Sequence, residues 1–376
     1  MAAPFVFAAC SNLSGCEKNL LHQHSVICAS FLRESIAMPG NVAQNSASSE
    51  LKSGDHCGAG DAQFDGITSH MKPILELSEV SKSYDEFKAV DRLSMTIPQG
   101  SVFGLLGPNG AGKTSSIRMM IGITVPDSGE VRTFGESFRR EHLQRIGYLP
   151  EERGLYKRMK IGEVLVFFAQ LKGVSQSDAK KRSQYWLERL ELTQWTTSKV
   201  EELSKGMQQK VQFIAAVLHE PEFMILDEPF SGLDPENAME LKNILLELKK
   251  AGKTILFSTH RMDTVEKLCD SICLINQGRG VLQGDLKQIK SSYGRSSIQM
   301  EYEGEVDFLT DASLVQSSNN YGNYVELKMQ PGVDSQHLLA RAMQSAQVNR
   351  FELVEPSLEQ IFIDTVKSSK VVASNA

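Results

Sequence analysis

The segment Gly107-Pro-Asn-Gly-Ala-Gly-Lys113-Thr114 has the residue types and spacing of a phosphate-binding loop. It follows the apolar run Val102–Leu106, a predicted strand, and precedes a predicted helix. Because glycine has no Cβ, the backbone N–H groups of such a loop can surround phosphate oxygens, and the helix N-terminus adds partial positive charge. Lys113 is expected to reach the β- and γ-phosphates, and the Thr114 hydroxyl to bind Mg²⁺. The predicted nucleotide-binding residues here are Gly107, Pro108, Asn109, Gly110, Ala111, Gly112, Lys113, Thr114 and Ser115.

Two adjacent carboxylates follow a second apolar run, in Phe223-Met-Ile-Leu-Asp227-Glu228. A buried strand would deliver both at its C-terminal end, where ligands bind in α/β sheets. Asp227 is expected to hold Mg²⁺ directly or through water, and Glu228 to orient and polarise the attacking water. Alone, the pair would also suit a strand with a solvated acidic end. Together with the phosphate-binding loop it predicts a nucleoside triphosphatase, without indicating which class.

A third segment, Leu203-Ser204-Lys-Gly-Met-Gln-Gln-Lys210, lies between these two and precedes a predicted helix. The Ser204 hydroxyl, the Gly206 N–H and the helix N-terminus can form a second phosphate cradle, although Ser204 alone would also suit an ordinary helix N-cap. The segment resembles the signature of the ABC ATPase family, usually Leu-Ser-Gly-Gly-Gln, with Lys205 and Met207 at two variable positions. The resemblance implies that Ser204 and Gly206 meet the γ-phosphate held by a partner subunit.

Further residues match motifs of this family in the family's order. Tyr84 precedes the phosphate-binding loop by a span that suits the aromatic residue stacked on adenine. Ser231-Gly-Leu-Asp234 resembles the D-loop, which lies across the dimer interface. His260 follows a predicted strand and resembles the switch histidine that contacts the γ-phosphate. A tyrosine or a histidine at such a strand end would also suit a structural role, so these functional roles rest on the resemblance.

The segment Ile146-Gly-Tyr-Leu-Pro-Glu151 resembles the stretch that ends in the family's Q-loop, but it departs from the pattern at its last residue. The family usually has glutamine, with a neutral carbonyl, where this chain has Glu151. A carboxylate can still bind Mg²⁺, so Glu151 joins Thr114 and Asp227 in the predicted metal site. Its negative charge beside the triphosphate is expected to change the coupling to a membrane subunit in detail.

The chain has 376 residues, a formal net charge of −6 and 41% hydrophobic residues, a balance typical of soluble globular proteins. Its mild acidity argues against a nucleic-acid binder, which usually carries a basic patch. No apolar run approaches the roughly 18–20 residues that span a bilayer, so we expect any membrane span to belong to another chain. The six cysteines match no zinc spacing and are expected to be inert thiols in a reducing cytosol.

From Ile74 to about residue 290, strand-like and helix-like apolar patterns alternate. This alternation predicts an α/β fold with a mostly parallel sheet covered on both faces. The resemblance adds the architecture of a P-loop ABC cassette, with an antiparallel β subdomain and a helical subdomain. The predicted strands are Ile74–Val80, Leu93–Ile97, Val102–Leu106, Gly129–Phe134, Phe223–Leu226, Thr254–Ser258 and Ser271–Asn276. The predicted helices are Thr114–Ile123, much of Ile161–Leu192, Val211–Leu218, Ala238–Lys250 and Val265–Cys269.

Residues 1–70 differ in composition from the predicted cassette, residues 71–290. They are rich in Ser, Ala, Gly, Asn and Cys and lack sustained periodicity, which favours a disordered extension or an unused upstream start. Met71 begins a run that reads as a natural protein start followed at once by a strand. A secretory signal is rejected because a basic n-region is missing and the apolar stretch is very short; a transit peptide stays open.

Residues 291–376 are predicted to form a small α+β domain with a flexible tail. Its predicted strands are Ser296–Tyr302, Tyr324–Met329 and Arg350–Val354, and its predicted helices are Ser335–Ala346 and Leu358–Val366. The tail segment Glu355-Pro-Ser-Leu-Glu-Gln-Ile-Phe362 and the run Gly147–Tyr156 resemble ABC subunits of sodium-efflux and drug-resistance exporters. The role of this small domain does not follow from the spacing of its residues.

The resemblance implies an ATP-hydrolysing subunit of an exporter that drives a separate transmembrane permease. Two such cassettes, in a homodimer or a paired cassette, would hold two ATP molecules between Lys113 of one chain and Ser204 of the other. ATP and Mg²⁺ are the implied cofactors, and nucleic acid is not an expected partner. The chain would lie at the cytoplasmic face of the cell membrane, attached indirectly through the permease. The transported substrate is not encoded in this chain.

Three other functions compete with this one. Soluble ABC-type ATPases that act on ribosomes or DNA usually carry two cassettes in one chain or a long coiled-coil insert, and this sequence shows neither. A non-enzymatic, nucleotide-gated scaffold would not need both Glu228 and His260. A P-loop kinase has no use for the segment 203–210. An ATPase assay of the wild type beside Glu228→Gln would separate the enzyme from the scaffold.

Overall fold

The computed structural model describes residues 72–152, 154–293 and 297–365 of the chain. The chain divides into two units between Met71 and Lys72, and all described residues belong to the second unit. The predicted extension over residues 1–70 therefore lies outside the described residues, as do Ser296 and Val366 at the ends of two predicted elements.

The core of the cassette is a six-stranded sheet with the order β10-β9-β3-β8-β7-β6. Its strands are β3 (Val102–Leu106), β6 (Ile146–Leu149), β7 (Phe223–Asp227), β8 (Thr254–Thr259), β9 (Ser271–Asn276) and β10 (Arg279–Asp285). All neighbours are parallel except β10, which pairs antiparallel with β9. Every residue of β3, β7 and β8 is buried, as expected for strands covered on both faces. The predicted α/β fold with a mostly parallel sheet is confirmed.

A second, antiparallel sheet has the order β2-β1-β4-β5. Its strands are β1 (Pro73–Tyr84), β2 (Phe87–Pro98), β4 (Ser128–Thr133) and β5 (Glu136–Ser137). The β1–β2 hairpin is longer than predicted, and its last pair sets Tyr84 opposite Phe87. The predicted antiparallel β subdomain is confirmed, and its hairpin presents two aromatic side chains at one end.

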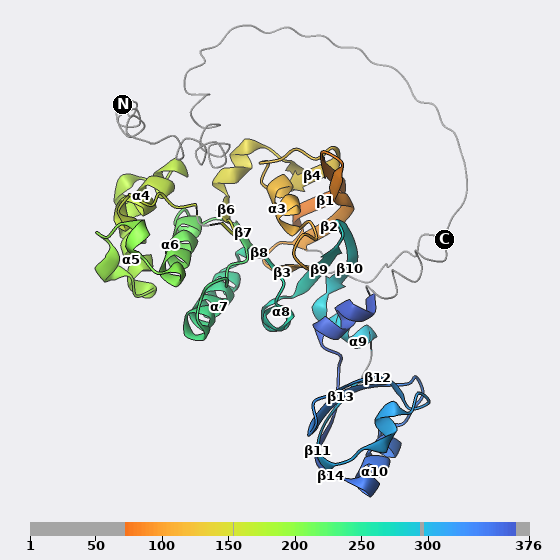
Figure 1. Cartoon of the computed structure of the whole chain (residues 1–376). Helices are drawn as coiled ribbons and strands as arrows, with labels where there is room; N and C mark the ends of the chain where they lie inside the picture. Colours follow the sequence, from red (N-terminus) through yellow and green to blue (C-terminus); the bar gives the residue numbers. More distant parts are fainter. Residues whose placement is uncertain (1–71, 153, 294–296, 366–376) are drawn as a thin grey trace, which may run out of the picture. The chain divides into compact units, whose positions relative to one another are not determined.

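Helices surround these sheets (Figure 1). They are α3 (Lys113–Met120), α4 (Ile161–Leu171), α5 (Gln176–Arg189), α6 (Lys205–Val217), α7 (Pro235–Lys250), α8 (Met262–Leu268) and α9 (Leu286–Ser292). Helices α4, α5 and α6 pack on one another and form the predicted helical subdomain. Side-chain oxygens of Ser175, Ser204 and Asp234 accept hydrogen bonds from backbone N–H groups in the first turns of α5, α6 and α7. Within the described ranges, no helix is both long and apolar enough to cross a membrane.

The small C-terminal domain is an antiparallel sheet with one helix on it, and it has a core of its own (Figure 1). The strand order is β12-β13-β11-β14, from β11 (Ser297–Gly304), β12 (Val315–Asn320), β13 (Tyr324–Met329) and β14 (Ala346–Val354), with the helix α10 (Ser335–Ser345). A last helical segment covers residues 358–365. Its Leu358 and Ile361 are fully buried in the same core as apolar residues of α8, so this segment belongs to the cassette's packing. The predicted α+β character of this domain is confirmed.

Two predicted helical segments differ from the structure, and strands β10 and β12 were not predicted, each for a local reason. Helix α6 begins at Lys205, where Ser204 caps it, rather than at Val211. The earlier start was missed because the first two turns of the helix carry mostly polar residues. The run Ile161–Leu192 is two helices, separated at Gly173, whose φ of 81° favours glycine. Strand β10 was not predicted because it contains two glycines and is half exposed. Strand β12 was missed because its residues after Val315 are polar and exposed.

Strand β6 approaches α6 so closely that its Gly147 has no room for a side chain. A Cβ at this position would lie 2.3 Å from the Ala216 carbonyl oxygen, so Gly147→Ala is expected to destabilise the protein by about 1–3 kcal/mol, as overpacking does. Urea unfolding measures this. Gly173→Ala is the comparison, because that position is open and carries only the backbone strain of its positive φ. Equal stability of the Gly147→Ala variant and the wild type would contradict the close β6–α6 contact.

Candidate active site

The phosphate-binding loop connects β3 to α3, and its glycines are needed for its path. Gly107 has a φ of 152°, and a Cβ there would lie 2.2 Å from the Ile275 carbonyl oxygen. Gly112, which caps α3, has a φ of 107°, and a Cβ there would lie 2.5 Å from the Ala89 carbonyl oxygen. Any larger residue at either position would collide with backbone, so the loop can follow this course only with glycine.

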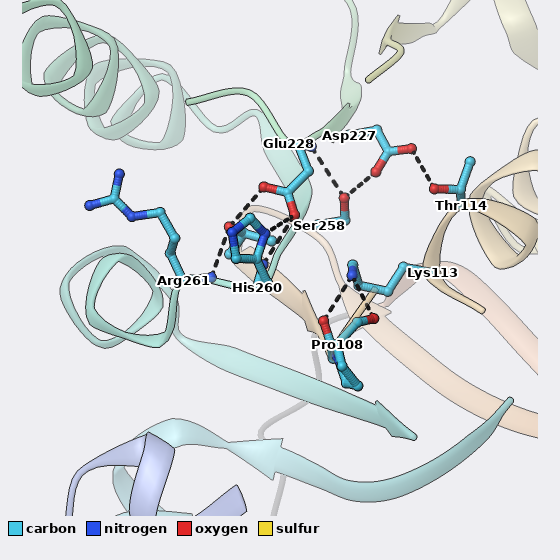
Figure 2. A network of polar contacts seen from close by, with 10 residues as sticks. Pro108, Lys113, Thr114, Asp227, Glu228, Ser258, His260 and Arg261 are labelled. Atoms are coloured by element: carbon cyan, nitrogen blue, oxygen red, sulfur yellow. Dashed lines mark hydrogen bonds and ion pairs between the residues drawn. The ribbon is translucent and has the colours of Figure 1, made fainter. Parts of the chain in front are cut away.

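Lys113 is the first residue of α3, and its side chain folds back over the loop (Figure 2). Its Nζ donates to the carbonyl oxygens of Gly107, at 2.8 Å, and Pro108, at 3.1 Å. Only 7% of the residue is exposed. A buried ammonium needs such partners, and here they hold the cation above the loop that is predicted to bind phosphate.

Asp227, the last residue of β7, is 1% exposed and has a partner on each side. Thr114 Oγ1 donates to its Oδ2 at 3.1 Å, and the Ser258 hydroxyl donates to its Oδ1 (Figure 2). Burial raises the pKa of this carboxyl group, and the hydrogen bonds from Ser258 and Thr114 oppose that rise. Two of the three predicted metal-binding residues, Thr114 and Asp227, are therefore in direct contact.

Glu228 follows with a φ of 47°, in the left-handed region, a conformation that costs a side-chain-bearing residue about 1–3 kcal/mol. Its backbone N–H donates to the Ser258 carbonyl oxygen at 3.2 Å. Its carboxylate accepts hydrogen bonds from Thr259 Oγ1 at 3.1 Å and from the His260 N–H at 3.1 Å, and His260 Nδ1 lies 2.8 Å from Oε1 (Figure 2). The structure thus joins the two residues predicted to be catalytic.

A pocket of about 320 Å³ contains most of the predicted site. Its lining includes ten predicted residues: Tyr84, Asn109, Gly110, Gly112, Lys113, Thr114, Ser115, Glu151, Asp227 and Glu228. A larger surface hollow of about 600 Å³ lies along α7 and contains none of these ten. The smaller pocket is the candidate active site, because the residues that can bind phosphate and activate water converge on it.

Phe87 also lines this pocket and was missed from the sequence. It lies opposite Tyr84 in the β1–β2 hairpin. Phe87 is 65% exposed and Tyr84 39%, so each ring presents surface to solvent in this structure. The sequence does contain a signal for Phe87, because two residues separate it from Tyr84, as in a two-residue hairpin turn. That signal can be used only once the position of the turn is known.

Glu151 lies in the pocket with Asp227 and Glu228. Burial raises the pKa of its carboxyl group first, the negative charges of Asp227 and Glu228 raise it further, and Lys113 lowers it. The additional negative charge that distinguishes this chain from the usual family pattern therefore acts on the same site as the paired carboxylates.

Ser204, Gly206 and Asp234 do not line the pocket. Ser204 caps α6 by accepting from the Met207 N–H at 3.3 Å, and Asp234 caps α7 by accepting from the Asn237 N–H at 2.9 Å. A Cβ on Gly206 would lie 3.4 Å from the Gly232 carbonyl oxygen, so the start of α6 lies against the segment that resembles the D-loop. The structure places the predicted second phosphate cradle apart from the nucleotide pocket of the same chain.

The fold and the site together define a nucleotide-hydrolysing cassette. One α/β sheet carries the predicted phosphate-binding loop and two carboxylates at the end of a strand, and the helix that follows the signature-like segment is capped by Ser204. The family model described as "ABC transporter" matches residues 90–231, and the model "ATP-binding protein DrrA1-3-like, C-terminal domain" matches residues 284–366. The chain belongs to the ATP-binding proteins of ABC transporters: it binds and hydrolyses ATP, and cassettes of this family dimerise and act with permease subunits.

Similar proteins extend the match over most of the chain. It is 44% identical over 293 residues to YhaQ of Bacillus subtilis strain 168, an uncharacterized ABC transporter ATP-binding protein, covering 78% of this chain and 98% of that protein. It is 31% identical over 303 residues to the linearmycin resistance ATP-binding protein LnrL of the same organism, covering 77% and 97%. A solved structure titled as an ATP-binding subunit of an ABC transporter superposes with a TM-score of 0.56 at 32% identity, covering 59% and 93%. The predicted resemblance to drug-resistance exporters is confirmed.

If Tyr84 and Phe87 form the platform for adenine, removing either ring weakens ATP binding. Stacking of a base on an aromatic side chain contributes about 1–3 kcal/mol, so Tyr84→Ala and Phe87→Ala should each raise the Kd for ATP by about 5–150-fold. Isothermal titration measures the Kd, with Tyr185→Ala, an exposed ring outside the pocket, as control. An unchanged Kd in Phe87→Ala would leave Tyr84 as the sole stacking residue.

Proposed function

We propose that this chain hydrolyses ATP as one half of a head-to-tail dimer that powers a separate transmembrane permease. The observation that carries the proposal is the separation of two half-sites within one chain. Lys113, Thr114, Asp227 and Glu228 line one pocket, whereas Ser204, at the start of α6, does not. In a two-fold dimer each signature meets the pocket of the other chain, so both sites become complete through one self-complementary interface.

The residue types at the pocket suit Mg²⁺ as cofactor. Thr114, Asp227 and Glu151 offer hydroxyl and carboxylate oxygens, the ligands that Mg²⁺ prefers. The described residues contain no group of three His, Cys, Asp or Glu side chains able to hold a metal by themselves. That agrees with Mg²⁺ bound by one or two carboxylates together with substrate phosphates. Bound there, the ion would neutralise charge on the β- and γ-phosphates.

The proposed chemistry assigns one task to each side chain. When ATP enters, Lys113 gives up its hydrogen bonds to the loop carbonyl oxygens and donates to phosphate oxygens instead. Glu228 takes a proton from the attacking water, whose oxygen forms a bond to the γ-phosphorus while the bond from that phosphorus to the β–γ bridging oxygen breaks and ADP leaves. His260, which already contacts Glu228, contacts the γ-phosphate and orients that carboxylate. Ser204 and Gly206 of the other chain complete the binding of the γ-phosphate.

Export is the direction that the relatives favour. LnrL is named for linearmycin resistance, a property that an efflux system provides, and the C-terminal match is to an ATP-binding protein of the DrrA type. We therefore propose an exporter subunit at the cytoplasmic face of the cell membrane, attached through the permease. We also propose functional limits at residues 71–290 for the cassette and 291–376 for the accessory domain, within which the last helical segment, residues 358–365, packs on the cassette. A soluble ABC-type ATPase with a non-membrane partner is the alternative, and isolation of the chain with a membrane protein would exclude it.

Glu228→Gln should trap the dimer. The amide keeps the size of the side chain but cannot act as a base, so we expect ATP hydrolysis to fall by at least about 100-fold. With Mg²⁺ and ATP, gel filtration of this variant should show a dimer that the wild type populates only briefly. A Glu228→Gln chain that also carries Lys113→Ala is the control and should stay monomeric. If the Glu228→Gln variant with ATP showed only monomer, that would contradict this sandwich dimer, in which each ATP lies between Lys113 of one chain and Ser204 of the other.

A further inference from the structure

Helix α6 buries two glutamines on the side that faces the sheet. Gln209 is 2% exposed and Gln212 is 4% exposed. Residues three apart lie on the same face of a helix. Burying a side-chain amide is costly unless it forms hydrogen bonds, so the partners of these two side chains indicate what their presence achieves.

Both amides donate to backbone beside residues of the active site. Gln209 Nε2 donates at 3.1 Å to the Pro229 carbonyl oxygen, directly after Glu228. Gln212 Nε2 donates to the carbonyl oxygens of Pro150, at 3.1 Å, and Glu152, at 3.0 Å. These two carbonyls flank Glu151, which lines the pocket. Gln212 itself does not line the pocket.

The other half of the Gln212 amide makes this arrangement unusual. Its Oε1 is buried and has no hydrogen-bond partner among the described residues. An apolar side chain of similar size would avoid this unpartnered acceptor, but it would also leave the carbonyl oxygens of Pro150 and Glu152 without their donor. What Gln212 contributes is therefore its two N–H bonds, which hold the backbone on both sides of Glu151.

The position of Gln212 on α6 gives these bonds a further consequence. The same helix begins at the Ser204 cap and includes Gly206, and it is a continuous element of 13 residues. A displacement of the Glu151 segment when ATP binds would pull on α6 through Gln212 and so move the signature. Within one chain, Gln212 connects the pocket that binds one nucleotide to the cradle offered to the other.

We propose that Gln212 is a positioning residue for ATP hydrolysis: it holds Glu151 at the pocket and couples ATP binding there to the placement of Ser204 for the partner chain. This role rests on the sandwich dimer proposed above. Gln212 acts through backbone and touches no reacting atom.

Gln212→Leu tests the proposal, since it keeps the approximate volume and removes both N–H donors. The Kd for ATP should stay within about twofold of the wild type, because the phosphate-binding loop and the aromatic pair are untouched. The kcat should fall by about tenfold or more, because Glu151 and the signature segment would no longer be held in fixed positions relative to each other. In a Glu228→Gln background, the ATP concentration needed for half-maximal dimerisation should rise by about the same factor.

Two further variants separate this role from a general loss of stability. Val217→Ala removes buried volume from the far end of α6 and should lower the melting temperature without the loss of kcat. Gln212→Met keeps the unbranched shape but has no N–H to donate, so it should repeat the kinetic defect and serves if the leucine variant fails to fold.

The outcomes distinguish this proposal from the one on which it rests. If wild-type kcat and dimerisation are retained in every Gln212 variant that folds, or if Val217→Ala loses as much kcat as Gln212→Leu, the positioning role is wrong. If the Glu228→Gln chain without further changes does not dimerise on ATP, the sandwich arrangement fails instead.

Discussion

The buried carboxylate of Asp227 is the interaction on which the rest of the site depends. It joins the end of β7 to Ser258 of β8 and to Thr114 of α3, residues 31 and 113 positions away along the chain. A carboxylate this deeply buried is costly without partners, and these two hydroxyls supply them. Because β8 ends and α3 begins at the same edge of the sheet, the interaction fixes the phosphate-binding loop next to Glu228, which directly follows β7. The left-handed backbone of Glu228 then turns its side chain towards His260.

Under the dimer proposed above, the same geometry leaves the chain functionally incomplete by itself. The pocket gathers the groups that bind phosphate and activate water, but Ser204 and Gly206 stand at the start of α6, against the Gly232 segment, and not at that pocket. In the dimer proposed above, helix α6 has two roles in one cassette: its N-terminus meets the nucleotide of the other chain, and its buried glutamines attach it to the backbone around its own pocket. An element that serves two sites in this way is suited to report the state of one site to the other.

The sequence predicted those parts of the structure that are determined by contacts between residues close together in the chain. Strands β3 and β7 were predicted correctly, as was the position of the Asp227–Glu228 pair at the end of β7, because each is a short run in which residue type and spacing carry the constraint. The departure at Glu151 was also visible, and the structure adds that burial, and then the neighbouring carboxylates, raise the pKa of its side chain.

What sequence reasoning missed depends on long-range contacts or on polar segments. Phe87 belongs to the pocket only through the register of a hairpin. The first turns of α6 have little apolar periodicity, so the helix seemed to start at Val211. Gln212 looks like an ordinary polar residue in an amphipathic helix, because its partners Pro150 and Glu152 lie about sixty residues earlier in the chain.

The central claim is that each active site is built from two chains, and complementation tests it most directly. Lys113→Ala removes the phosphate-binding cation from both sites of a homodimer, and Ser204→Phe blocks both signature cradles, so each variant alone should be inactive. In a mixed dimer, one site combines the intact Lys113 of one chain with the intact Ser204 of the other. The account predicts that mixing the two inactive proteins in equal amounts restores ATPase activity to about one quarter of the wild-type rate per chain, since half of randomly assembled dimers are mixed and each has one complete site. No recovery from two folded variants that are shown to form mixed dimers would contradict it.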